Sequence, residues 1–179
     1  MANAREILSR MKSVQDTRKI TNAMYLISST KLKKSKRLLE ETEPYFYTLQ
    51  DLIRRILRHM PDVEHFYFNP RSEIKGADRT KGLIVITGDK GLAGAYNHNV
   101  LKMAQEWMEQ GDNHRLYVVG ELGRHYFASK HIPVEEQFHY TVQNPTMHRA
   151  RLISSTVLED YEQGQLDEVW ILYLSLIHI

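Results

Sequence analysis

Hydrophobic residues in the first forty positions recur at helical spacing. Spacings of three, four and seven occur among the apolar residues of this stretch, which are Ile7, Met11, Val14, Ile20, Met24, Ile27, Leu32, Leu38 and Leu39. This spacing keeps them near one face of a helix, as a two-helix coiled coil requires. Thr21, Ser28 and Ser35 stand where strict heptads would place leucine, so a permanent leucine zipper is a poor fit.

Helix-breaking residues are absent from the same stretch. The first proline is Pro44 and the first glycine is Gly76. Because a glycine costs about 1 kcal/mol and a proline about 3 kcal/mol in a helix interior, their absence favours one uninterrupted helix. A helix from Ala2 to about Glu43 would be roughly 60 Å long, which exceeds the diameter of a small domain. Such a helix needs another long partner.

A second helical stretch follows Pro44, where the first helix should kink or end. Its apolar residues again form a stripe: Phe46, Leu49, Leu52, Ile53, Ile56, Leu57 and Met60. Prolines and polar residues then mark a connection. The pattern therefore predicts a long N-terminal helix over residues 1–60, kinked near Pro44, a linker over 61–81, and a separate domain over 82–179.

The pattern changes in the last hundred residues, where short apolar runs alternate with amphipathic stretches. Strands are predicted over 83–86, 116–119, 132–138 and 169–174, and helices over 100–110, 122–130 and 146–163. Near-continuous apolar strands separated by helices are typical of a parallel sheet covered on both faces. The fold class is therefore α/β: a small, doubly wound, mostly parallel sheet domain, with a long helix that supplies half of an antiparallel coiled coil.

Charge divides the chain into a basic rod and a mildly acidic body. Residues 1–40 hold ten Lys and Arg against three acidic residues, a net charge of +7, while the remainder holds 14 against 19, a net charge of −5. This asymmetry predicts an anionic partner for the rod, whether protein, nucleic acid or membrane surface. The densest basic run spans 31–37 and forms either a solvated helix face or a phosphate-binding surface, although no aromatic residue interleaves with it.

A glycine-rich segment, Gly88-Asp89-Lys90-Gly91-Leu92-Ala93-Gly94, joins the first predicted strand to its helix. Phosphates bind at this position in many α/β folds. The glycines fall at intervals of three, unlike the dinucleotide fingerprint, and no Lys-Ser/Thr follows them as in a P-loop. A tight turn that needs glycine conformations, with Asp89 stabilising it by a hydrogen bond, is the alternative to nucleotide binding.

Composition excludes several classes of protein. The 179 residues contain no cysteine, which rules out a disulfide scaffold, a cysteine nucleophile and a thiolate metal site. The longest apolar run, 169–179, is too short to span a bilayer, and the N-terminus lacks the apolar core of a secretory signal. The chain contains no G-x-S-x-G motif, no H-E-x-x-H motif and no set of kinase motifs. We therefore predict no catalytic residue, no cofactor and no metal ligand.

Two motifs resemble one family. The helical segment Ser13-Val14-Gln15-Asp16-Thr17-Arg18-Lys19-Ile20-Thr21-Asn22-Ala23-Met24 is similar to the N-terminal helix of the gamma subunits of F-type ATP synthases. The segment Ile86-Thr87-Gly88-Asp89-Lys90-Gly91-Leu92-Ala93-Gly94-Ala95-Tyr96-Asn97 is similar to the signature that follows the first strand in that family. The two motifs occur in the family's order, and the resemblance covers about residues 2–173.

The resemblance implies a bacterial central-stalk subunit without catalytic residues of its own. In that family the N-terminal helix pairs antiparallel with a long C-terminal helix inside the hexamer of alpha and beta subunits. The α/β domain lies near epsilon and the c-ring, and rotation of the stalk couples proton flow to ATP synthesis. The implied location is peripheral, on the cytoplasmic side of the cell membrane, and no nucleic acid is a partner.

The resemblance also assigns roles to residues. The residues implied to pack against the partner helix are Ile7, Met11, Val14, Ile20, Met24 and Ile27. Those implied to face acidic levers of the beta subunits in the hexamer are Arg10, Lys12, Arg18, Lys19 and Lys31. The loop is implied to be structural rather than nucleotide-binding, through Gly88, Asp89, Gly91, Gly94 and Asn97.

The similarity stops at residues 174–179, where the family continues into further strand and the long C-terminal helix. We therefore expect a chain truncated in or after its last strand, whose rod lacks its partner and which cannot transmit torque by itself. Two other functions stay open on the residues alone: nucleic-acid binding by the basic helix, and a small nucleotide-binding α/β protein. A steep loss of affinity with salt would mark the first, and nucleotide binding in calorimetry the second.

Overall fold

The computed structural model describes residues 2–60, 65–68, 71, 74, 78–109, 111, 113–134, 138, 142 and 145–175. The chain forms two compact units, Met1–Phe68 and Asn69–Ile179. The first contains α1 (Ala2–His59) and a 3-10 turn, η1 (Phe66–Phe68). The second contains β1 (Lys81–Ile86), α2 (Tyr96–Met108), β2 (His114–Val119), α3 (Glu121–Ser129), α4 (Met147–Glu162) and β3 (Glu168–Leu172).

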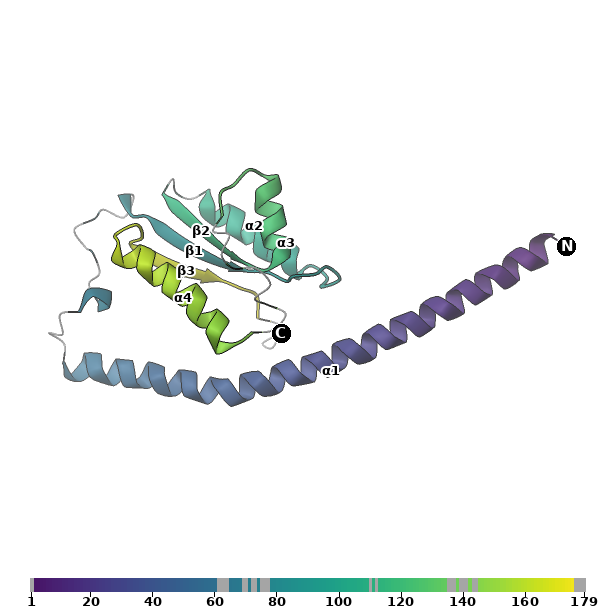
Figure 1. The fold of residues 1–179 in the computed structure, drawn as a ribbon, viewed down its shortest axis with the longest axis horizontal. Coiled ribbons are helices and arrows are strands. Elements are labelled where there is room, and N and C mark those ends of the chain that lie inside the picture. Colours follow the sequence, from purple (N-terminus) through teal and green to yellow (C-terminus); the bar gives the residue numbers. More distant parts are fainter. Residues whose placement is uncertain are drawn as a thin grey trace. The chain divides into compact units, whose positions relative to one another are not determined.

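Helix α1 is continuous over 58 residues, about 87 Å at 1.5 Å per residue. It does not end at Pro44, which lies inside it. Figure 1 shows the helix as one ribbon that changes direction along its length. A proline removes one helical hydrogen bond and crowds the preceding turn, which bends a helix more readily than it terminates one when both flanks are strongly helical.

Threonine hydroxyls on α1 are satisfied within the helix. Thr21 Oγ1, at one of the positions where a heptad would place leucine, donates to the carbonyl of Thr17 at 2.9 Å. Thr17, Thr30, Thr42 and Thr48 make the same bond to the carbonyl four residues before them. These polar residues therefore need no partner outside the helix.

The second unit is a three-stranded parallel sheet in the order β2-β1-β3. Alternating residues of β1 face opposite sides, as the period of a strand requires. Leu83 and Val85 pack with residues of α2 and α3, and Ile84 packs in a second cluster with Val157 of α4. Helices thus cover both faces of the sheet, as Figure 1 shows, and the predicted doubly wound parallel fold is confirmed.

Local signals explain the ends of α4. Thr146 follows Pro145 in an extended conformation, and its side chain accepts a hydrogen bond from the Arg149 N–H at 3.3 Å. This is the usual N-cap arrangement, which satisfies one of the free donors of the first turn. Gly164, at a φ of 74°, ends the turn after the helix.

Two strand predictions need correction. The strand expected over 132–138 is absent from its described part, because Ile132 to Val134 and Phe138 lie in no strand, and residues 135–137 lie outside the described residues. The last strand, β3, is present but is not buried like β1. It forms an edge of the sheet, and Val169, Trp170 and Ile171 are exposed.

Candidate interaction surface and glycine-rich loop

The six residues that were expected to pack against a partner helix are all exposed on α1. Their exposed fractions range from 46% for Met24 to 68% for Val14. Isolated apolar residues at a surface are ordinary, but a row of them along a long helix marks an interaction surface. The helix therefore offers a surface that its own unit leaves uncovered.

These six residues do not share one face of the helix, contrary to the expectation from their spacing. The gap between Val14 and Ile20 is six residues, which at 100° per residue turns the direction by about 120°. Heptad supercoiling would absorb only about 20° per heptad. The exposed apolar residues therefore form two separate stripes along the helix. Stripe one comprises Ile7, Met11, Val14, Tyr25, Leu32 and Leu39, and stripe two comprises Ile20, Met24, Ile27 and Leu38.

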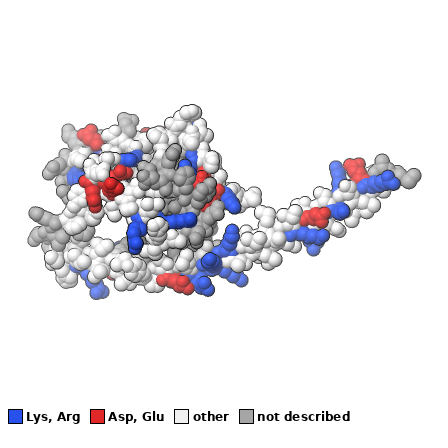
Figure 2. All heavy atoms as spheres, in the orientation of Figure 1, with Lys and Arg blue, Asp and Glu red and all other residues white. Residues whose placement is uncertain are grey.

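The five predicted cationic contacts also lie on α1, where Figure 2 shows Lys and Arg distributed along the helix. Arg10 lies 3.9 Å from Glu6, and Lys19 lies 3.4 Å from Asp16, in exposed pairs that contribute little to stability. Within the described part of the chain, Lys12, Arg18 and Lys31 make no ion pair. Helical geometry places Arg10 and Arg18 beside stripe one and Lys31 beside stripe two.

Two side chains, Asn97 of α2 and Asp89 of the loop itself, accept hydrogen bonds from backbone N–H groups and fix the glycine-rich loop. The N–H of Gly88 donates to Asn97 Oδ1 at 2.8 Å, so the first donor of the loop is occupied. Asp89 Oδ1 accepts from the Glu121 N–H at 3.1 Å, at the N-terminus of α3. A carboxylate at a helix N-terminus takes the place in which α/β folds hold a phosphate.

The tip of the loop is exposed and adopts left-handed backbone conformations. Leu92 has a φ of 65° and is 92% exposed, and Gly94 has a φ of 57°. A β carbon added at Gly91 or Gly94 would meet no atom within 4 Å. Gly94 is therefore explained by its φ, whereas neither φ nor space requires the glycine at 91.

Close packing beside this loop was not predictable from the sequence pattern. Thr87, directly before Gly88, is buried, and its Oγ1 accepts from the Gly123 N–H at 3.0 Å. A β carbon on Gly120 would lie 2.3 Å from the Thr87 carbonyl oxygen, and one on Gly123 would lie 2.7 Å from Val118 Cγ1. The two glycines allow the turn after β2 to pack directly on the end of β1.

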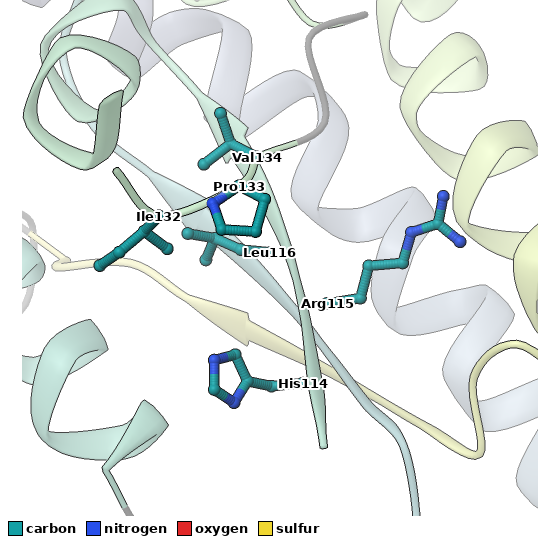
Figure 3. Close-up of a pocket in the computed structure, with 6 residues that line it drawn as sticks. All are labelled: His114, Arg115, Leu116, Ile132, Pro133 and Val134. Atoms are coloured by element: carbon teal, nitrogen blue, oxygen red, sulfur yellow. The ribbon is translucent and has the colours of Figure 1, made fainter. Parts of the chain in front are cut away.

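A cavity of about 260 Å³ opens beside the start of β2. It is lined by His114, Arg115, Leu116, Ile132, Pro133 and Val134. Figure 3 shows the Arg115 side chain directed away from His114 and Ile132, and Arg115 Nη1 instead lies 3.2 Å from Asp160 Oδ1. A small-molecule site requires a few polar groups that point toward one place, and the polar groups of this lining do not.

Within the described ranges, no three His, Asp or Glu side chains gather closely enough to hold a metal ion. None of the helices among those residues has the length and apolar character needed to cross a membrane.

Two carboxylates at the start of β3 are held in their charged form. Burial opposes the charge of Asp167, but hydrogen bonds from Arg71 and from the Thr80 N–H, with the charges of Arg71 and Arg79, lower its pKa below the ordinary value. The hydrogen bond from Arg79 likewise lowers the pKa of Glu168 below the ordinary value, although partial burial acts to raise it.

Acid should therefore destabilise the second unit. Because the folded pKa values lie below the unfolded values of about 4, the stabilisation is present at neutral pH and lost as the pH falls through the folded pKa values. We expect Asp167→Asn to lower the free energy of unfolding at pH 7 by roughly 2 kcal/mol and to flatten its decline below pH 4. Urea titrations from pH 7 to pH 2.5 measure this, with Asp16→Asn on α1 as the control. Parallel profiles for the parent and Asp167→Asn would contradict it.

Comparison with known proteins gives the family. The fold defines a class of α/β protein in which a long helical arm with exposed apolar stripes is joined to a small parallel α/β unit. The family model described as ATP synthase matches residues 3–178. The chain belongs to this family, in its gamma-chain group.

The relatives carry the name of that group. The chain is 46% identical over 178 residues to the ATP synthase gamma chain of Ruminiclostridium cellulolyticum, covering 98% of this chain and 59% of the relative. It is 42% identical over 172 residues to the ATP synthase gamma chain of Caldanaerobacter subterraneus, covering 96% of this chain and 58% of the relative. A gamma chain described as sodium ion specific, from Acetobacterium woodii, is 35% identical over 175 residues, covering 98% of this chain and 56% of the relative. The chain thus spans less than two thirds of the length of these relatives.

Proposed function

We propose that the chain contributes to the central stalk of an F-type ATP synthase. On this proposal α1 lies inside a hexamer of alpha and beta subunits and the α/β unit lies near epsilon and the c-ring. The observation that carries the proposal is the match of residues 3–178 to the family model, together with relatives named gamma chain. The place of action is the cytoplasmic side of the bacterial cell membrane, through the complex.

The mechanism is mechanical and needs no catalytic residue in this chain. A rotating shaft that is not three-fold symmetric contacts each of three catalytic subunits differently at any moment. Each contact favours one of that subunit's open or closed states, so rotation drawn from proton flow moves the three subunits through these states in turn. Differential contact requires a shaft whose faces differ, and on α1 stripe one occupies only one side of the helix.

We assign a separate partner to each stripe. Stripe two, with Ile20, Met24 and Ile27, packs against the partner helix. Stripe one faces the surrounding subunits, because Arg10 and Arg18 lie beside it and supply charge for acidic groups there. A single partner helix cannot cover two stripes about 120° apart, which supports two contacts rather than one.

The glycine-rich loop is structural on this proposal. The hydrogen bonds from Gly88 to Asn97 and from Glu121 to Asp89 occupy donors that a phosphate would need. We expect no heat of binding when ATP, ADP or NAD is titrated into the chain at millimolar concentration. Binding that is lost on Asp89→Ala substitution would favour the nucleotide-binding alternative.

Co-purification tests membership of the complex. The tagged 179-residue chain, co-expressed with the alpha and beta subunits of Ruminiclostridium cellulolyticum, should retain both subunits through washes at moderate salt. A chain that recovers neither subunit, yet binds duplex DNA with an affinity that falls steeply with salt, would instead be the basic-helix nucleic-acid binder.

A further inference from the structure

Two arginines that precede β1 reach across to the start of β3. Arg71 Nη1 donates to Asp167 Oδ1 at 2.8 Å and also to the carbonyl of Leu166. Its Nη2 donates to the carbonyl of Tyr161 at 2.7 Å, and its guanidinium lies 4.1 Å from the centre of the Tyr161 ring. The side chains of Arg71 and Asp167 are only 13% and 8% exposed. One side chain thus joins the segment before β1 to the end of α4 and the start of β3.

Arg79 forms a second connection beside the first. Its Nη1 donates to Glu168 Oε1 at 2.6 Å, and its Nη2 donates to the carbonyl of Arg71 at 3.1 Å. The backbone adds two bonds, because the Thr80 N–H donates to Asp167 Oδ2 and the Asp167 N–H donates to the Thr80 carbonyl, both at 2.8 Å. We name this set of contacts the linker strap: Arg71, Arg79 and Thr80 with Asp167 and Glu168.

The position of the strap in the chain is informative. Arg71 is the first described residue of the α/β unit, so any tension that passes along the chain from α1 reaches the strap before it reaches β1. Arg71 also holds a φ of 45°, in the left-handed region that non-glycine residues seldom occupy. Such strain persists only where the surroundings hold it, and here the guanidinium with its three acceptors does so.

We propose that the linker strap is a mechanical anchor that passes force from the linker directly to the start of β3 and the end of α4. This deepens the proposed stalk function, on which its biological meaning rests. A lysine in place of Arg71 would not reproduce the anchor, because its single ammonium lacks the planar fork that meets three acceptors at once.

Loss of the strap has a defined mechanical consequence. With the strap intact, the load enters at Arg71. With the strap open, the ten residues from 71 to 80 must extend before tension reaches Lys81. The slack this adds is at most about 30 Å, which is the length of ten extended residues. A stalk with such slack would store rotation in its linker instead of transmitting it. The strap therefore sets the stiffness of the connection as well as the stability of the unit.

Single-molecule pulling on the full chain tests the anchor. The chain has no native cysteine, so Met60→Cys on the residue after α1 and Lys102→Cys on α2 give unique attachment points. Before the α/β unit unfolds, the R71M/R79M chain should extend further than the parent, by at most about 30 Å. The matched control is R115M, which removes an ion pair with Asp160 elsewhere in the same unit and should extend like the parent.

Equal extension of the parent and R71M/R79M before unfolding would overturn the anchor. If R71M/R79M shows no cooperative unfolding event, R71M alone and D167N are pulled under the same criterion. Extra extension in either supports the proposal, and none in both overturns it. Because the pulling experiment needs no other subunit, its failure would leave the stalk function standing, and a failed co-purification would leave the anchor standing.

Discussion

Replacing Gly120 with alanine is expected to destabilise the α/β unit by more than about 3 kcal/mol. The added β carbon would lie 2.3 Å from the carbonyl oxygen and 2.6 Å from the Oγ1 of Thr87, at a φ of 107°. Neither the backbone oxygen nor the buried Thr87 side chain can withdraw without breaking hydrogen bonds to Val119. The turn would therefore have to move off the end of β1.

Urea unfolding followed by tryptophan fluorescence measures this loss. Both tryptophans, Trp107 and Trp170, belong to the α/β unit, so the signal reports on that unit. Gly91→Ala is the matched control, because its β carbon meets no atom within 4 Å and its φ is not positive. A Gly120→Ala chain as stable as Gly91→Ala would show that the turn is not packed as described.

Replacing Ile20 and Ile27 with aspartate is expected to abolish assembly while leaving the isolated chain folded. Both side chains are more than half exposed, so the stability of the isolated chain should change by less than about 0.5 kcal/mol. In a helix pair, each isoleucine would lose about 1.5–3 kcal/mol of burial and an unpaired carboxylate would be buried in its place. The contact should therefore weaken by at least about a hundredfold.

A second double variant of equal charge serves as the control. Gln15→Asp with Asn22→Asp adds the same two carboxylates at the same seven-residue spacing, on the side of the helix away from stripe two. Circular dichroism of the isolated chains checks folding. Recovery of alpha and beta subunits checks assembly, with each variant carried in a Ruminiclostridium cellulolyticum gamma chain that supplies the rest of its own length. Equal recovery for the two double variants would contradict the assignment of stripe two to a partner.

Much of the fold was predictable because periodicity is a local property. The run Leu83-Ile84-Val85-Ile86 and the run Leu116-Tyr117-Val118-Val119 both lie within observed strands. The run that begins at Val169 is just as apolar, yet β3 is an exposed edge. Apolar content predicts a strand, whereas its place in the sheet depends on the order of pairing, which no single run encodes.

The candidate site shows the same limit. The glycines of the loop stood out in the sequence, but the partner of Asp89 is a backbone N–H 32 residues away. The contact between Thr87 and Gly120 joins segments that no local pattern connects. On α1, the spacings within Ile7-Met11-Val14 and within Ile20-Met24-Ile27 suggested one shared face. Because the helix is continuous, the six-residue gap between Val14 and Ile20 places the two groups on different faces.

A chimera tests the central claim most directly. Residues 1–172 of this chain would replace the matching stretch of the Ruminiclostridium cellulolyticum gamma chain, which is 46% identical over 178 residues and supplies the rest of its own length. The control carries the same junction with the native residues restored. Assembled with the remaining subunits in membrane vesicles, the chimera should support ATP-driven acidification at a rate comparable to the control. A chimera that folds but is missing from the assembled complex, or that assembles and drives no acidification, would contradict the proposal that this chain works as part of the rotating stalk.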